Sequence, residues 1–253
     1  MMPDDGFSRD TPDHDGILAA LGSVLHLTET GQPVDSGPDI LAMLSPAEIA
    51  RLVRAGREAA YGAGEFFFRQ GDRHDGIHFI RSGRVRSFYV SPGGREITLA
   101  YWPSGHFVGA PQILGGGEHM WSSVAVEPSV GLWLPGAVLR GLIRETPNLG
   151  IALIEGLVHK SMCYTALLQI MGTQSKISRL GHLLLTLAAP ASQTGNQAVV
   201  RQHLTQEELA NLIGSTRQAI STTLDKFERQ GLIERQGDAI RITDVDGLRA
   251  LCD

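Results

Sequence analysis

Residues 204–242, LTQEELANLIGSTRQAISTTLDKFERQGLIERQGDAIRI, constrain the fold most, because they hold two short helical patterns separated by one glycine. Apolar residues repeat at helical spacing in both patterns, and the first pattern follows a threonine suited to capping. Gly214 favours the left-handed conformation that ends a helix, and Ser215 or Thr216 can cap a second helix over about residues 217–230. The sequence therefore predicts two helices joined by a tight turn.

The second predicted helix has one apolar face and one polar face. The polar residues of its first two turns are Arg217, Gln218, Ser221 and Thr222. An arginine, an amide and hydroxyl groups at this place are typical of a helix-turn-helix, whose recognition helix enters the DNA major groove. The dipeptide Gly237-Asp238 predicts a tight hairpin immediately afterwards. The pattern therefore favours a winged helix-turn-helix over the alternative, an ordinary helical hairpin packed in a core.

The charge distribution removes an objection to DNA binding. The chain has 253 residues, of which 42% are hydrophobic, and a net charge of -5, which is unfavourable for binding DNA. Eight acidic residues against the single cation Arg9 lie within residues 1–40, so the rest of the chain is slightly positive. We expect residues 1–38 to form an acidic, partly disordered extension with one apolar patch, GILAALGSVLHL.

Cysteine usage and hydropathy indicate a cytoplasmic protein. The two cysteines, Cys163 and Cys252, are too few for a disulfide framework or for a four-cysteine iron-sulfur cluster within one chain. The first ten residues lack the cationic start and apolar core of a signal peptide. We expect no apolar run long enough to span a bilayer and no membrane association.

Residues 62–135 change to short apolar runs separated by glycine, which predict regularly spaced strands in a sandwich or barrel-like roll. The predicted turns are Gly71-Asp72, Ser82-Gly83, Pro92-Gly93-Gly94, Ser104-Gly105 and Pro128-Ser129. Before the roll, Ser45 and Glu48 have the spacing of a capping box that opens a short helix.

A long helical run follows the roll, with Thr146 as its predicted cap and Pro147 in its first turn. Residues at alternating spacings of three and four predict the seam of a two-stranded coiled coil. These residues are Ile154, Leu157, Ser161, Tyr164, Leu168 and Met171. Pairing is favoured because a helix-turn-helix protein reads two half-sites as a two-fold dimer. The alternative is a helix buried within one chain.

The order of roll, long helix and winged helix-turn-helix resembles the Crp/Fnr family of bacterial transcription regulators over roughly residues 40–250. The motifs RQGD, IRSGRVRSFYVSPGGREITLAYWPSGHFVG and GSTRQAISTTLDKFERQGLI carry the resemblance. It implies an α+β protein with a cyclic-nucleotide-binding-like β-roll (a double-stranded β-helix or jelly roll), a long dimerisation helix and a C-terminal winged helix-turn-helix. The expected divisions are residues 1–38 (extension), 39–145 (sensor roll), 146–173 (dimerisation helix) and 174–253 (DNA-binding domain). The resemblance also implies a homodimer, a palindromic double-stranded DNA operator, and RNA polymerase as a partner.

The roll departs from the cyclic-nucleotide-binding pattern of this family. Gly109 is in place, but Ala110 stands where the family's binders carry the glutamate that accepts from ribose. Met120 and Trp121 stand where an Arg-Ser pair would hold the phosphate, and Tyr164-Thr165 replaces a Thr-Ser pair on the long helix. Without the cation, a phosphodiester would leave its charge unpaired. We therefore expect an effector other than cyclic AMP, or none.

The same segment suggests the chemistry of an effector. The glycines at 115–117 predict a flexible loop over a pocket lined by Ile113, Met120, Trp121 and Tyr164, which suits an apolar or aromatic molecule. A packed core is the alternative. No cofactor is predicted, although histidines at 74, 78, 106 and 119 leave haem or a metal as an alternative for a gas or redox sensor. No catalytic constellation is found, so we do not expect an enzyme.

The resemblance assigns roles to the recognition helix. Arg217 matches a base-reading arginine, and its fork suits guanine, whereas Gln218 replaces a glutamate and can read adenine. Ser221 can reach a base or a phosphate, and Thr222 stands where an arginine is common. We predict phosphate contacts from Thr205, Thr216, Lys226, Arg235 and Arg241. For Lys226, Arg235 and Arg241, the alternative is a solvated face. A second alternative for the function is a winged helix that binds protein rather than DNA.

Overall fold

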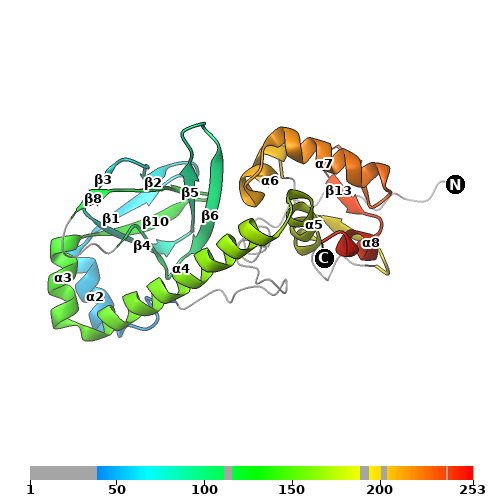
Figure 1. Cartoon of the computed structure of the whole chain (residues 1–253). Coiled ribbons are helices and arrows are strands. Elements are labelled where there is room, and N and C mark those ends of the chain that lie inside the picture. Colours follow the sequence, from blue (N-terminus) through cyan, green and yellow to red (C-terminus); the bar gives the residue numbers. More distant parts are fainter. Residues whose placement is uncertain (1–38, 111–115, 189–193, 201–203, 238, 253) are drawn as a thin grey trace.

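The computed structural model describes residues 39–110, 116–188, 194–200, 204–237 and 239–252. It has a β-roll, a long helix and a winged helix-turn-helix in chain order, as expected (Figure 1). The predicted N-terminal extension, the predicted pocket residue Ile113 and Gly115 of the predicted loop lie outside the described residues.

Helix α2 (Pro46–Ala55) precedes the roll and begins with the predicted capping box. The hydroxyl of Ser45 accepts from the amide of Glu48 at 3.4 Å, and the Glu48 carboxylate accepts from the Ser45 amide at 2.8 Å. Two free amides at the helix start are therefore satisfied locally.

The roll consists of two four-stranded antiparallel sheets and a two-stranded ribbon. The first sheet has the order β1 (Arg57–Tyr61), β10 (Ser129–Pro135), β4 (Gly76–Ser82), β7 (Phe107–Val108). The second has the order β2 (Phe66–Phe68), β9 (Ser122–Ala125), β5 (Arg84–Val90), β6 (Glu96–Pro103), and the ribbon pairs β3 (Arg73–His74) with β8 (Gly117–Glu118). Positive φ angles at glycines 71, 83, 94 and 105 confirm four of the predicted turns. Strand β1 precedes residue 62, where the predicted strands begin. The sequence analysis missed it because its largely exposed residues lack an apolar alternation.

One helix packs against the roll and leads the chain to the long helix. Helix α3 (Gly136–Glu145), which the sequence analysis missed, packs against β4 and β10. Helix α4 (Pro147–Thr173) follows it without a gap. Pro147 occupies the first turn as predicted, but Thr146 makes no capping bond, and its hydroxyl instead accepts from Arg51 at 3.2 Å.

Helix α4 covers almost the predicted residues 146–173, but it is more apolar than the sequence analysis expected. Its length and composition meet those of a membrane span, so the expectation of no such run was wrong. However, 44% of its most apolar 18-residue window is buried inside the protein. Buried residues such as Leu149, Leu153 and Cys163 face the roll, as in the core helix of a globular protein.

The C-terminal domain is built around the predicted pair of helices, α6 (Gln206–Ile213) and α7 (Arg217–Arg229). They pack with α5 (Lys176–Leu187), α8 (Val245–Ala250) and a sheet of order β11 (Ala198–Val200), β13 (Ala239–Ile242), β12 (Ile233–Gln236). Gln236 pairs with Ala239, so β12 and β13 form the predicted two-residue hairpin. Helix α6 also packs against β6, which joins this domain to the roll (Figure 1).

Candidate DNA-binding surface and effector cavity

The turn between α6 and α7 is fixed by local hydrogen bonds. Thr205 caps α6 reciprocally, since its hydroxyl accepts from the Glu208 amide at 3.2 Å and its amide donates to the Glu208 carboxylate at 2.7 Å. Gly214 ends α6 in the left-handed region, with φ of 61°. Of the two predicted caps for α7, Thr216 accepts from the Ala219 amide at 3.2 Å. The orientation of α7 against α6 is therefore preorganised.

Helix α7 turns its apolar face inward and its polar face to solvent. Ile220, Leu224 and Phe227 are buried in the core of this domain. The residues predicted to read bases are Arg217, Gln218 and Thr222, all exposed, and Ser221, which is half-buried. Arg217 makes no hydrogen bond or ion pair with any other described residue. Its guanidinium is therefore available to a ligand.

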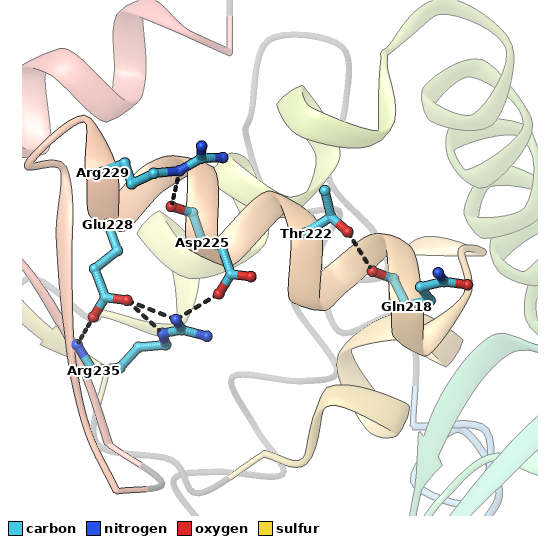
Figure 2. A network of polar contacts seen from close by, with 6 residues as sticks. All are labelled: Gln218, Thr222, Asp225, Glu228, Arg229 and Arg235. Atoms are coloured by element: carbon cyan, nitrogen blue, oxygen red, sulfur yellow. Dashed lines mark hydrogen bonds and ion pairs between the residues drawn. The ribbon is translucent and has the colours of Figure 1, made fainter.

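Not every polar group on this surface is equally available. The Thr222 hydroxyl donates to the backbone oxygen of Gln218 at 3.0 Å, so its proton is used within the helix, while its lone pairs stay open (Figure 2). Lys226 and Arg241 are half-buried and have no ion-pair partner among the described residues.

Arg235, on β12, is already paired. Its guanidinium donates to Glu228 at 2.6 and 3.1 Å and to Asp225 at 2.6 Å, and both carboxylates belong to α7 (Figure 2). Hydrogen bonds from the Arg235 side chain hold the pKa of Glu228 below its usual value. Arg235 therefore ties the wing to the recognition helix, which argues against its predicted use as a free phosphate contact.

A second candidate site is a cavity of about 400 Å³ between the roll and α4. The roll contributes Ser87, Trp102, Val108, Gly109, Ala110 and Trp121, and α4 contributes Leu157, Lys160, Ser161, Tyr164, Thr165 and Leu168. Five predicted pocket residues are among these. Met120 is not, because its side chain is 75% exposed to solvent.

Lys160 is the one charged residue among the cavity residues that the sequence analysis missed. Only 7% of it is exposed, and its ammonium lies 3.2 Å from the ring centre of Trp102 and 4.9 Å from that of Phe107. Burial lowers the pKa of Lys160 to about 7. The acid beside Lys160 is Cys163. Burial raises the pKa of its thiol to about 11, so the thiol is neutral at physiological pH. The one sequence signal was that Lys160 is the only lysine or arginine in α4.

The histidines of the roll pack against aromatic rings. His119 stacks on Phe68 with ring centres 3.7 Å apart and on His74 at 4.5 Å. His74 Nε2 accepts from the Ala110 amide at 2.9 Å. Burial lowers the pKa of both His78 and His119 to about 4. Within the described residues, no group of three or more His, Cys, Asp or Glu side chains could hold a metal ion.

The exposed face of α4 is apolar but is rotated from the predicted seam. Its exposed apolar residues are Ile151, Ile154, Leu157, Val158, Met162 and Leu168. Two residues of the predicted seam are instead half-buried within the chain. Tyr164 packs on the roll core, and Met171 lies against the turn at Gly214, where an added Cβ would be 2.6 Å from its methyl carbon. The chain itself therefore partly covers these two predicted positions, whereas the other four predicted positions are exposed.

Residues 178–251 match the Crp-like helix-turn-helix domain, and residues 58–146 match the cyclic nucleotide-binding domain. The chain is 26% identical over 189 residues to the fumarate and nitrate reduction regulatory protein of Salmonella typhimurium, covering 74% of this chain and 75% of that relative. It is 28% identical over 209 residues to the cyclic AMP receptor protein of Thermus thermophilus, covering 83% and 94%.

Solved structures share the fold. The c-di-GMP responsive global regulator CLP of Xanthomonas campestris superposes with a TM-score of 0.68 at 19% identity, covering 78% of this chain and 99% of that chain. A putative transcriptional regulator of the crp/fnr family from Eubacterium rectale gives 0.66 at 21% identity, covering 87% and 99%. At these sequence identities, the comparison with solved structures shows a shared fold and no more.

Proposed function

This chain belongs to the Crp/Fnr family of DNA-binding transcription regulators, and from that premise we propose that it reads a palindromic operator as a homodimer through the first two turns of α7. The observation that carries the proposal is the contrast between two arginines. Arg217 is exposed and free among the described residues, whereas Arg235 is held by two carboxylates of α7. The relatives are transcription regulators and not enzymes.

Base reading is assigned to the exposed start of α7. Arg217 offers the planar fork that binds guanine through two acceptors, and Gln218 offers the donor and acceptor that match adenine. Ser221 is half-buried and reaches a base or a phosphate, and Thr222 can accept but not donate because its proton is used within the helix. Two strong contacts and two adaptable ones per half-site support sequence-specific binding.

Phosphate contacts are assigned to the rim of this surface. Thr205 and Thr216 stand at the two helix starts, where free amides and the positive end of the dipole favour an anion. Lys226 and Arg241, which have no ion-pair partner among the described residues, supply positive charge from α7 and the wing. Arg235 keeps a supporting role, since it fixes the wing relative to α7.

Dimerisation is assigned to the exposed apolar face of α4. Five residues of α4 follow one another at spacings of three, four, seven and three positions and lie on one face, as a two-stranded seam requires. These residues are Ile151, Ile154, Val158, Thr165 and Leu168. So many exposed apolar side chains on one helix face indicate an interface rather than a solvated surface. A two-fold axis along α4 would place two copies of α7 for two half-sites.

The cavity is assigned to an effector other than cyclic AMP. Ala110 cannot accept from a ribose hydroxyl, and no arginine lines the described part of the cavity. An effector here would contact both the roll and α4, so its binding would change the orientation of the DNA-binding domains. The regulator would act in the cytoplasm, with RNA polymerase as the partner of the DNA-bound dimer.

Selection of random double-stranded DNA by the purified protein without added ligand tests the proposal. We expect enrichment of a palindrome whose half-sites lie about one helical turn apart, and a steep loss of affinity for it with salt. No enrichment, both alone and with an extract of small molecules from cells, would contradict DNA reading and favour a protein-binding winged helix.

A further inference from the structure

Lys160 is a buried lysine to which the described residues offer no carboxylate, so it bears the full cost of burial when it is protonated. Its ammonium lies over the face of Trp102 at 3.2 Å, an attraction that offsets only part of the cost of removing the charge from water. Buried ammonium groups in proteins are ordinarily paired with an anion. The side chain also lines the cavity between the roll and α4, so a bound molecule can reach it.

We propose that this cavity binds a small organic monoanion, an aromatic or branched carboxylate, whose charged group pairs with Lys160 while its apolar body lies against Trp121 and Tyr164. The inference rests on the proposed function, because it names the chemical class of the effector assigned to this cavity. Within the described residues, Lys160 is the one cation in the lining, so the charge to be matched is a single negative one.

The rest of the lining fits such a molecule. Hydroxyls of Ser161 and Thr165, on the turns of α4 that follow Lys160, can donate to a carboxylate without bringing a competing charge. Val108 and Trp121 from the roll provide apolar surface for a ring or a branched chain. A volume of about 400 Å³ lies in the range of pockets for small organic ligands.

The lining disfavours a cyclic nucleotide, although such a molecule is also an anion. Its free ribose hydroxyl would need an acceptor, and the described lining contains no carboxylate. The buried hydroxyl of Ser87 is already bonded to Ser123 at 2.8 Å and accepts from Trp102 at 3.1 Å. Polar groups of a nucleotide would therefore be left unpaired in the cavity, a cost that a carboxylate with an apolar body avoids.

A pair of probes that differ only in charge tests the proposal. Naphthylacetate and its neutral amide, naphthylacetamide, have nearly the same shape, and calorimetry on the full-length protein gives both affinities. We expect the wild type to prefer the anion by roughly tenfold to a hundredfold, the usual worth of a charged hydrogen bond. Lys160→Met should abolish this preference while keeping binding of the amide.

Two controls make the result decisive. Lys176→Met removes an exposed lysine outside the cavity and should leave the preference for the anion unchanged. Lys160→Gln, checked by thermal unfolding, provides a second neutral variant if the methionine variant is poorly folded. No preference of the wild type for naphthylacetate, or a preference that survives both Lys160 variants, would overturn the proposal.

The same variants separate this proposal from the proposed function. DNA selection requires α7 and not Lys160, so Lys160→Met should still enrich the wild-type palindrome. If the palindrome is found and the anion preference is absent, only the ligand assignment fails. If the anion preference is found and no palindrome is enriched, the cavity assignment stands and the DNA proposal fails.

Discussion

The winged helix-turn-helix and the junction between the roll and α4 treat their polar groups in opposite ways. In the DNA-binding domain, Thr205 and Thr216 cap the helices and Arg235 is matched by two carboxylates at the surface. At the junction, Lys160 is buried without a carboxylate partner among the described residues. The caps and the ion pair of the first region are satisfied within the chain, whereas the second region retains an electrostatic cost that a ligand can remove. The first region is therefore preorganised for the DNA reading proposed above, and the second is the region whose energy a bound ligand would change most.

The largest effect on the protein is expected from a charge on the apolar face of α4, where we propose that two copies of the chain meet. Val158→Glu would bury two unpaired carboxylates across a two-fold seam, and each costs several kcal/mol. We expect sedimentation to show a monomer. Met43→Glu, the same kind of change at an exposed apolar residue outside α4, should leave the dimer intact. A dimeric Val158→Glu protein would contradict the assigned interface.

The variant Lys160→Met tests, through the free energy of unfolding, whether the junction between the roll and α4 retains an electrostatic cost. Because the pKa of Lys160 falls from 10.5 to about 7 on folding, the unfolded chain binds more protons between these values. Wild-type stability should therefore rise with pH across this window. Removing the charge should stabilise the protein by roughly 1–3 kcal/mol near neutral pH, and the gain should shrink near pH 10.5. Urea unfolding of the variant and of Lys176→Met checks this, and a less stable Lys160→Met protein at neutral pH would contradict it.

The two capping boxes allow a matched test of the two regions. Thr205→Ala and Ser45→Ala each remove one reciprocal cap, at a cost of about 1 kcal/mol in the free energy of unfolding. Calorimetry should show similar losses of stability. Only Thr205→Ala should also weaken DNA binding, because Thr205 lies at the proposed phosphate rim. Equal effects of the two variants on DNA affinity would remove Thr205 from that rim.

The smallest effect is expected from Arg235→Gln, because the pair with Asp225 and Glu228 is exposed and screened by salt. The pKa of Glu228 is lowered in the folded protein, so the contribution of this pair is present above the usual pKa of 4.5 and is lost as the pH falls below it. Thermal unfolding should show a loss smaller than that of either cap variant. The loss should disappear in high salt or acid, and an undiminished loss there would contradict a surface pair.

Local signals made the helix-turn-helix predictable. Thr205, Gly214 and the Gly237-Asp238 dipeptide each act within a few residues, so their positions in the sequence already indicated α6, α7 and the wing. The same holds for Ser45 and the glycine turns of the roll. Helix α3 was missed because it adjoins stronger patterns and begins without a side-chain cap, and α5, which Ser175 caps, was missed because it directly follows the stronger pattern of α4.

Long-range packing determined what could not be predicted. The environment of Lys160 depends on Trp102, more than fifty residues away, and the role of Arg235 depends on carboxylates on another element. Met171 met the spacing of the seam, but its contact with Gly214 turns it inward. Spacing identified the helix and its apolar character, while the fold decided which apolar residues remain exposed.

The affinity of Arg217→Ala for the selected operator and for random DNA tests the central claim most directly. If the start of α7 reads bases, the variant should lose roughly 1–3 kcal/mol per half-site on the operator and relax the preference at one base pair, with little change on random DNA. A double variant of Lys226 and Arg241 to alanine should instead weaken both and reduce the salt dependence. Equal losses of Arg217→Ala on operator and random DNA would contradict the account.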